Sequence, residues 1–155
     1  MMGSLKILVP YNFTDHDKKA LDFVHNTFAH LPEAGITIFH AYTPAPALET
    51  PDSAVTGKLK SSMGYLNQKI MQQGTELEEV KNQLIQSGLS GSRLDTVYKP
   101  RKKDVAAEII DLAKKEDFNI IVINHRPGRA TRFFSASVHN KVISGIKNIT
   151  VCLVS

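Results

Sequence analysis

The chain has 155 residues, of which 42% are hydrophobic and 22% charged, and its formal net charge is +4. This composition is typical of one soluble globular domain, and folding at this length buries roughly 70% of the surface of the unfolded chain. Cys152 is the only cysteine, which excludes an internal disulfide and favours a reducing, cytoplasmic setting. No apolar run is long enough to cross a bilayer, so we expect one domain over residues 1–155 and no membrane partner.

The amino-terminal quarter of the chain predicts a strand followed by a helix. Residues 5–9 form a short apolar run that Pro10 closes, which is typical of a strand buried on both faces. Thr14, with Asp17 three residues later, resembles a capping box, and apolar residues then recur at helical spacing up to Leu31. We therefore expect a turn at residues 11–14 and a helix after it.

A second strand and a long helix follow. Residues 36–42 are rich in Ile, Phe and Tyr and predict a strand. Three prolines then mark a loop, and the pattern predicts no conformation for residues 43–58. The apolar residues that follow recur at intervals of three and four, which predicts a helix with one apolar stripe. We expect this stripe to pack on the sheet; it comprises Leu59, Met63, Leu66, Ile70, Leu77, Val80 and Leu84.

The carboxyl-terminal half repeats the alternation of strand and helix. Residues 94–99 predict a third strand, and Asp104 is placed to cap the helix that follows. Residues 119–124 are the most strand-like run in the chain. After a polar loop, a short helix begins at Val138, and residues 149–154 form a last strand. The predicted order is therefore βαβαβαβαβ.

Strands that alternate with helices predict a mainly parallel sheet with helices on both faces. Five strands in this pattern allow the order 3-2-1-4-5, in which the direction of winding reverses between strands 1 and 4. Ligands of such sheets bind outside the carboxyl ends of the strands at this reversal. In this chain, residues 10–14 and 124–137 follow those two strands.

The loop after the fourth strand has the composition of an anion site. It carries Arg126, Arg129 and Arg132, and hydroxyl groups precede the next helix. Arginine forks match phosphate oxygens, and the amides at a helix start favour negative charge. A solvated basic loop is the alternative. The turn after the first strand has no glycine and brings acidic residues to its helix, which makes a dinucleotide-binding dehydrogenase improbable.

Three segments of the chain resemble the universal stress protein family. Residues 6–10, with Asn12, Thr14 and residues 19–21, are similar to the family's first strand, turn and helix. Residues 38–42 resemble its second strand, and residues 121–154 resemble its closing loop, helix and strand. The resemblance implies an α/β fold, a Rossmann-like (adenine nucleotide alpha hydrolase-like) three-layer sandwich with a five-stranded parallel sheet, and it implies a homodimer.

One branch of that family binds ATP through a loop of the form G-x2-G-x9-G-[ST]. The present loop departs from this form, because Ala136 stands in place of the last glycine and the loop is about one residue short. Asn12 stands where many members of the family carry an Asp that contacts the base. Ala41 matches a position whose backbone groups contact the base in the family. Missing glycines restrict close approach of the backbone to phosphate. We expect the side-chain charges of Arg126, Arg129 and Arg132 to supply the phosphate contacts that the backbone no longer makes.

We therefore expect a regulatory or ligand-sensing module with ATP or AMP as candidate ligands and no certain cofactor. The alternative is a homodimer that binds no nucleotide and acts through protein contacts. A slow ATP hydrolase ranks last, because no residue is placed as a general base, and neither a catalytic residue nor a metal site is predicted. The predicted ligand-binding residues are Pro10, Tyr11, Asn12, Thr14, Ala41, Asn124, His125, Arg126, Gly128, Arg129, Ser135, Ser137 and Val138.

Two further features concern partners. The last strand is apolar and predicted at a sheet edge, so we expect two copies to pair through Ile149, Val151 and Leu153. The basic residues between Lys99 and Lys103 follow the third strand and lack aromatic interleaving. They are interpreted as a solvated turn, and nucleic acid is an unlikely partner. His40 and His125 lie near strand ends, where a pocket could use them, and the alternative, which is the more common role of such a His, is to satisfy a backbone group.

Overall fold

A computed structural model describes residues 4–46, 54–125 and 138–155, with side chains from residue 61 onward in the second helix. Five parallel strands form one sheet in the order β3-β2-β1-β4-β5, as the sequence predicts. Its strands and helices are, in chain order, β1 (Leu5–Pro10), α1 (Asp15–Phe28), β2 (Ala34–Tyr42), α2 (Ala54–Gln86), a 3₁₀ turn (Gly91–Arg93), β3 (Leu94–Pro100), α3 (Val105–Lys115), β4 (Ile120–Asn124), α4 (Val138–Gly145) and β5 (Thr150–Val154).

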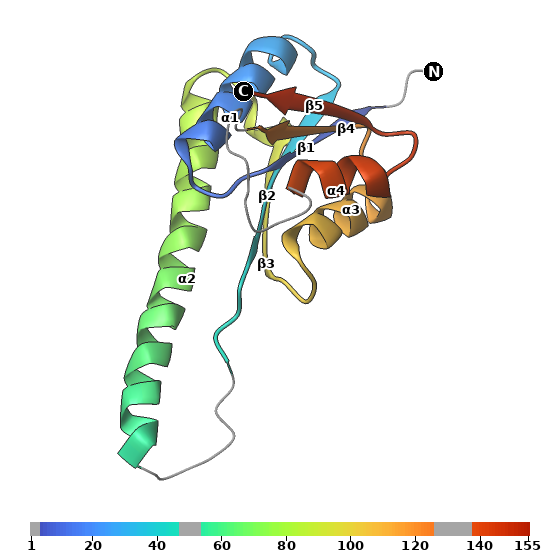
Figure 1. Ribbon diagram of the computed structural model, residues 1–155. Coiled ribbons are helices and arrows are strands. Elements are labelled where there is room, and N and C mark those ends of the chain that lie inside the picture. Colours follow the sequence, from blue (N-terminus) through green and yellow to red (C-terminus); the bar gives the residue numbers. More distant parts are fainter. Residues whose placement is uncertain (1–3, 47–53, 126–137) are drawn as a thin grey trace.

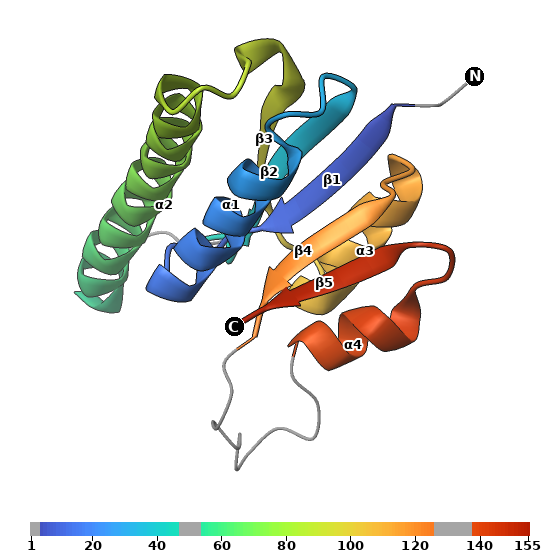
Figure 2. The same cartoon turned by 90° about the horizontal axis from the view of Figure 1, so that it is seen from above.

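Helices cover both faces of the sheet, which makes the fold a three-layer α/β sandwich. Figures 1 and 2 show α1 and α2 on one face and α3 and α4 on the other. Successive side chains of a strand point to opposite faces. In β1, Ile7 and Val9 accordingly pack on the side of α1 and α2, whereas Leu8 packs on the side of α3 and α4. This alternation divides the apolar core into two layers and explains why both faces of the central strands are buried.

Local signals set the start of α1 as the sequence predicts. The Thr14 hydroxyl accepts a hydrogen bond from the Asp17 N–H, and the Asp17 carboxylate accepts one from the Thr14 N–H, which completes a capping box. Asp104 caps α3 with a single bond, in which its side chain accepts from the Ala107 N–H. Asp17 is only 1% exposed, so its role exceeds that of a surface cap.

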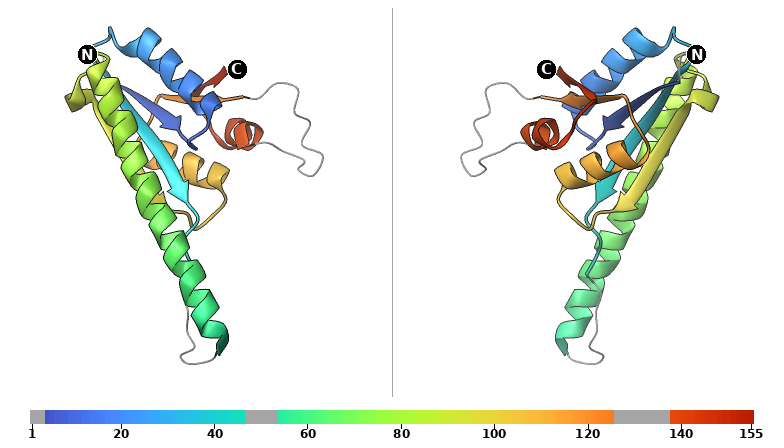
Figure 3. Two further views of the ribbon diagram at one scale, coloured as in Figure 1. Left: turned by 90° about the vertical axis from the view of Figure 1, so that its left-hand side faces the viewer. Right: turned by 90° about the vertical axis from the view of Figure 1, so that its right-hand side faces the viewer.

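The long helix α2 differs from the expectation that its whole apolar stripe packs on the sheet. Leu77 is buried and Val80 and Leu84 pack against the core, but Leu66 is 39% and Met71 74% exposed. A helix of 33 residues is about 50 Å long, whereas strands of five to nine residues span at most about 30 Å. The amino-terminal half of α2 therefore extends past the sheet (Figure 3).

No helix in the described parts of the chain has the length and apolar character that a membrane span requires.

Candidate functional site

The carboxyl edge of the sheet collects the segments that the sequence singles out. β1 lies between β2 and β4, so the turn after β1 is adjacent to the ends of both neighbours. The direction of winding reverses between β1 and β4, which is where ligands bind in open α/β sheets. Residues 10–14, Ala41 and Asn124 all lie at this edge, as predicted from the order of the elements.

The turn after β1 is organised by the buried Asp17 carboxylate. Its Oδ2 atom accepts hydrogen bonds from the Asn12 N–H at 3.0 Å, the Thr14 N–H at 3.1 Å and the Thr14 hydroxyl at 2.6 Å. Two converging backbone amides are a common anion-binding arrangement. In this chain the anion they bind is an internal carboxylate, so these amides are not available to a phosphate group.

Asp17 also connects the turn to the fourth strand, because its Oδ1 atom accepts a hydrogen bond from the Asn124 side-chain amide. The sequence predicts ligand contacts for Asn124 and Thr14, and the structure shows both in an internal hydrogen-bond network. Between Asn12 and Thr14, Phe13 has a positive φ of 60°, a left-handed conformation that is unfavourable for a residue with a Cβ. The Phe13 ring packs against the rings of Tyr11 and His40, which holds this conformation in place.

His125 and Val138 border the predicted anion loop. The His125 N–H donates to the Val154 carbonyl at 2.7 Å, and its ring meets the His139 ring edge-on at 4.6 Å between centroids. Burial lowers the pKa of His139, and the neighbouring His125 lowers it further. Val138 is exposed at the start of α4. The remaining predicted ligand residues, Arg126, Gly128, Arg129, Ser135 and Ser137, lie outside the described residues.

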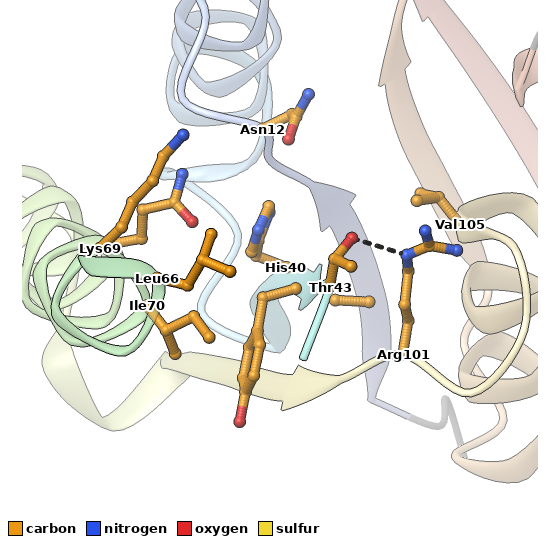
Figure 4. A pocket seen from close by; sticks show the side chains of 11 residues that line it. Asn12, His40, Thr43, Leu66, Lys69, Ile70, Arg101 and Val105 are labelled. Carbon is orange, nitrogen blue, oxygen red and sulfur yellow. Dashed lines mark hydrogen bonds between the residues drawn. The ribbon is translucent and has the colours of Figure 1, made fainter. Parts of the chain in front are cut away.

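A cavity of about 280 Å³ opens at the same edge, on the side of β2 and β3. Figure 4 shows its labelled side chains arranged around the cavity, and they come from α2, from the ends of β1 and β2, and from the connection between β3 and α3 together with the first residue of α3. Asn12 and Ala41, both predicted as ligand contacts, belong to the lining. The full lining is Asn12, His40, Ala41, Tyr42, Thr43, Leu66, Lys69, Ile70, Gln73, Arg101 and Val105.

His40 is the central polar side chain of this cavity. Its Nδ1 atom lies 2.8 Å from the Tyr11 carbonyl oxygen, and because a carbonyl only accepts, Nδ1 carries the hydrogen. The prediction that His40 satisfies a backbone group is therefore confirmed. Burial lowers the pKa of His40, although the bond to the Tyr11 carbonyl and the charge of Asp17 oppose this shift. In the neutral ring, Nε2 is left as a hydrogen-bond acceptor.

Aromatic rings support His40 from two sides. Phe13 meets its ring edge-on at 4.9 Å, and Tyr98 stacks on it at 5.7 Å between centroids. Tyr42 continues the row at 4.7 Å from Tyr98. The Tyr98 hydroxyl donates to the Ile70 carbonyl, so the row is also attached to α2. These contacts give the cavity a wall whose side chains have little freedom to move.

Lys69 and Arg101 bring positive charge to the cavity. Arg101 immediately follows β3, where its N–H donates to the Tyr42 carbonyl at 2.8 Å, and its Nε donates to the Thr43 hydroxyl at 2.9 Å. The pattern of residues predicts Arg101 in a solvated basic turn and gives no indication of a role for Lys69. The strand order contains the missing signal, because β3 ends beside β2 and therefore brings Arg101 to the same edge as Ala41.

Within the described segments, no three His, Cys, Asp or Glu side chains are grouped to hold a metal ion. The polar groups of the cavity are instead one imidazole, two amides, two hydroxyls and two cations. These groups are suited to hydrogen bonding and to the binding of anions.

Comparisons with known proteins show the family and the fold of the chain. A family model described as the universal stress protein family matches residues 4–151. The universal stress protein UspA from Lactobacillus plantarum has a similar structure, with a TM-score of 0.70, 17% identity and coverage of 100% of both chains. No curated protein matches the chain.

Two similar structures were solved with nucleotides. The universal stress protein from Archaeoglobus fulgidus in complex with dAMP has a TM-score of 0.64 and 19% identity, with 99% of this chain and 100% of that chain covered. A universal stress protein in complex with cAMP has a TM-score of 0.63 and 16% identity, with 99% and 98% covered. At these identities the similarity establishes a shared fold.

Proposed function

Because the chain belongs to the universal stress protein family, we propose that it is a homodimeric, cytoplasmic ligand-sensing module that binds an adenine nucleotide at the carboxyl edge of its sheet. The observation that carries this proposal is the cavity in which Asn12 and Ala41 meet. These are the two positions at which the family resemblance expects contacts to the base. Relatives of the same fold were solved with dAMP and cAMP.

The residues that we propose as phosphate contacts are inferred from the sequence. Arg126 and Arg129 follow β4 and supply guanidinium groups that match phosphate oxygens. The Asp17 network supports this division of roles, because it occupies the amides of the turn after β1 and leaves that turn unsuited to phosphate.

Titration of the purified protein with ATP, ADP and AMP tests the proposal, together with mass spectrometry of any small molecule that co-purifies. We expect binding that weakens with salt, and a loss of about tenfold or more in affinity in the double variant Arg126→Ala with Arg129→Ala. The control replaces two exposed lysines at the end of α3, Lys114→Ala with Lys115→Ala, which changes the net charge equally. Absence of nucleotide binding to the wild type contradicts the proposal.

A second candidate function is that of a dimer that binds no nucleotide and acts through protein contacts. The observation that favours it is the commitment of Thr14 and Asn124 to Asp17, since two predicted ligand contacts are then used internally. An empty protein after purification, with no affinity for the three nucleotides, is the result expected from this alternative.

A further inference from the structure

The cavity between α2 and the ends of β2 and β3 carries positive charge without an acidic counterpart. None of its eleven lining residues is Asp or Glu. Among the residues that the structure describes, neither Lys69 nor Arg101 forms an ion pair. Arg101 uses Nε for the Thr43 hydroxyl and Nη1 for the Lys103 carbonyl, while Nη2 has no hydrogen-bond partner in the described part of the chain.

Asp104, whose pKa Arg101 affects, and Asp17, whose charge acts on His40, both have other partners. Asp104 caps α3 through the Ala107 N–H and lies 3.5 Å from the Lys141 ammonium. That N–H is the main cause of a lowered pKa of Asp104, to which Lys141 and then Arg101 add. Asp17 is buried in its own hydrogen-bond network. Neither cation of the cavity therefore pairs directly with a carboxylate of the described chain, and a bound anion would supply that pairing.

The remaining lining is suited to the body of a small organic molecule. In Figure 4, His40 and Leu66 lie between Lys69 on one side and Arg101 on the other. Leu66 and Val105 are each 39% exposed, so apolar surface is available for a ligand to cover. Nε2 of His40 is an acceptor, because Nδ1 is committed to the Tyr11 carbonyl.

We propose that this cavity binds a small organic anion, with its phosphate or carboxylate group held by Arg101, an N–H or O–H group donating to Nε2 of His40, and Lys69 adding positive charge from the opposite side of the cavity. The proposal rests on the proposed function in placing the ligand at the carboxyl edge. It differs in placing the anionic group between α2 and β3, away from the loop after β4. Adenosine monophosphate and simple aromatic phosphates both have the required charge.

Calorimetric titrations with AMP, adenosine and phenyl phosphate test the position of the anion. We expect wild-type protein to bind AMP and phenyl phosphate more tightly than adenosine. Lys69→Met and Arg101→Gln should each weaken AMP and phenyl phosphate about tenfold and leave adenosine unchanged, and Lys69→Arg should restore affinity. The control Lys115→Met removes the same charge from an exposed residue at the end of α3 and should leave all affinities unchanged.

The two proposals fail in different ways. AMP binding that is unchanged by Lys69→Met and Arg101→Gln, but reduced by Arg126→Ala with Arg129→Ala, overturns the anion site between α2 and β3 and supports the proposed function. Phenyl phosphate binding that depends on Lys69, with no binding of any nucleotide, supports this anion site and overturns the proposed function. Failure of both AMP and phenyl phosphate to bind overturns this anion site, and failure of ATP and ADP to bind as well overturns the proposed function.

The role of His40 is measured in the same assay with His40→Asn. The asparagine amide can donate to the Tyr11 carbonyl as Nδ1 does, but it leaves no acceptor at the position of Nε2. We expect AMP, whose base carries an amino group, to lose several-fold in affinity. Phenyl phosphate should be unaffected, because it has no such donor. Equal effects on both ligands overturn this role of His40.

Discussion

Asp17 is the residue on which the carboxyl edge most depends. Its two oxygens accept hydrogen bonds from two backbone amides, the Thr14 hydroxyl and the Asn124 side chain, and it is 1% exposed. A carboxylate can accept all of these bonds at once. The residue thus joins the turn after β1, the start of α1 and the end of β4.

Replacement of Asp17 by Asn should lower the free energy of unfolding by about 2–4 kcal/mol, because an amide nitrogen cannot accept and is left facing donors. The control is Asp15→Asn, since Asp15 is exposed and its contact with Lys18 is 3.7 Å long. An exposed pair of this kind contributes about 0–1 kcal/mol. Urea unfolding of the two variants is the measurement, and equal midpoints would contradict the central role of Asp17.

Among the elements, α2 approaches β3 closely at Tyr98. The Cβ atom of an alanine at position 74 would lie 3.2 Å from the Tyr98 ring, which is shorter than most contacts of Cβ atoms in proteins. The ring cannot move away freely, because its hydroxyl donates to the Ile70 carbonyl and it packs against the rings of His40 and Tyr42. Gly74 therefore permits the close approach of helix and strand that positions the cavity wall.

Two glycine variants of the same helix separate this contact from helix propensity. Gly64→Ala meets open space and should raise the free energy of unfolding by up to about 1 kcal/mol, as alanine usually does in a helix. Gly74→Ala should show no such gain, because strain against Tyr98 offsets it. Thermal or urea unfolding measures both. An equal rise in stability in the two variants is incompatible with a tight contact at Gly74.

At the scale of the whole molecule, the edge of β5 that faces away from β4 is the expected dimer surface. β5 pairs with β4 on one side and is the last strand of the sheet, so its other side leaves backbone groups unpaired within the described chain. Leu153 is 45% exposed, whereas Val151 and Ile149 pack partly against the core. Pairing of two copies would cover the edge and the Leu153 side chain.

Leu153→Asp should therefore produce a monomer or insoluble protein, because a charge is introduced where two edges are proposed to meet. Met71→Asp, on the exposed surface of α2, is the control for adding a charge in place of an exposed apolar side chain. Light scattering after size exclusion reports the mass. A wild-type monomer at micromolar concentration would rule out this dimer. Val151→Asp is less informative, since it also disturbs the core.

The starts of α1 and α3 could be predicted because their caps are local, whereas α1 ends at Phe28 although the apolar spacing continues to Leu31. Thr14 and Asp17, three residues apart, meet in the first turn of the helix whatever the rest of the chain does. The apolar stripe of α2 is just as visible, but a helix of 33 residues is longer than the sheet that it covers. The stripe therefore predicts packing where the structure shows exposed Leu66 and Met71.

Residue order alone was enough to predict the succession of strands and helices, their caps and the two-layer core, because apolar periodicity and capping act between near neighbours. Residue order could not reveal that the Asn124 side chain donates a hydrogen bond to Asp17, 107 residues away. It also could not reveal that Arg101 lines the same cavity as His40 and Lys69. The predicted strand order brings these segments to one edge of the sheet, but the contacts themselves depend on where the side chains point and on how far α2 extends, and residue order indicates neither. The positive charge of the cavity therefore arises only in the folded chain, where Lys69 and Arg101 come to the same cavity.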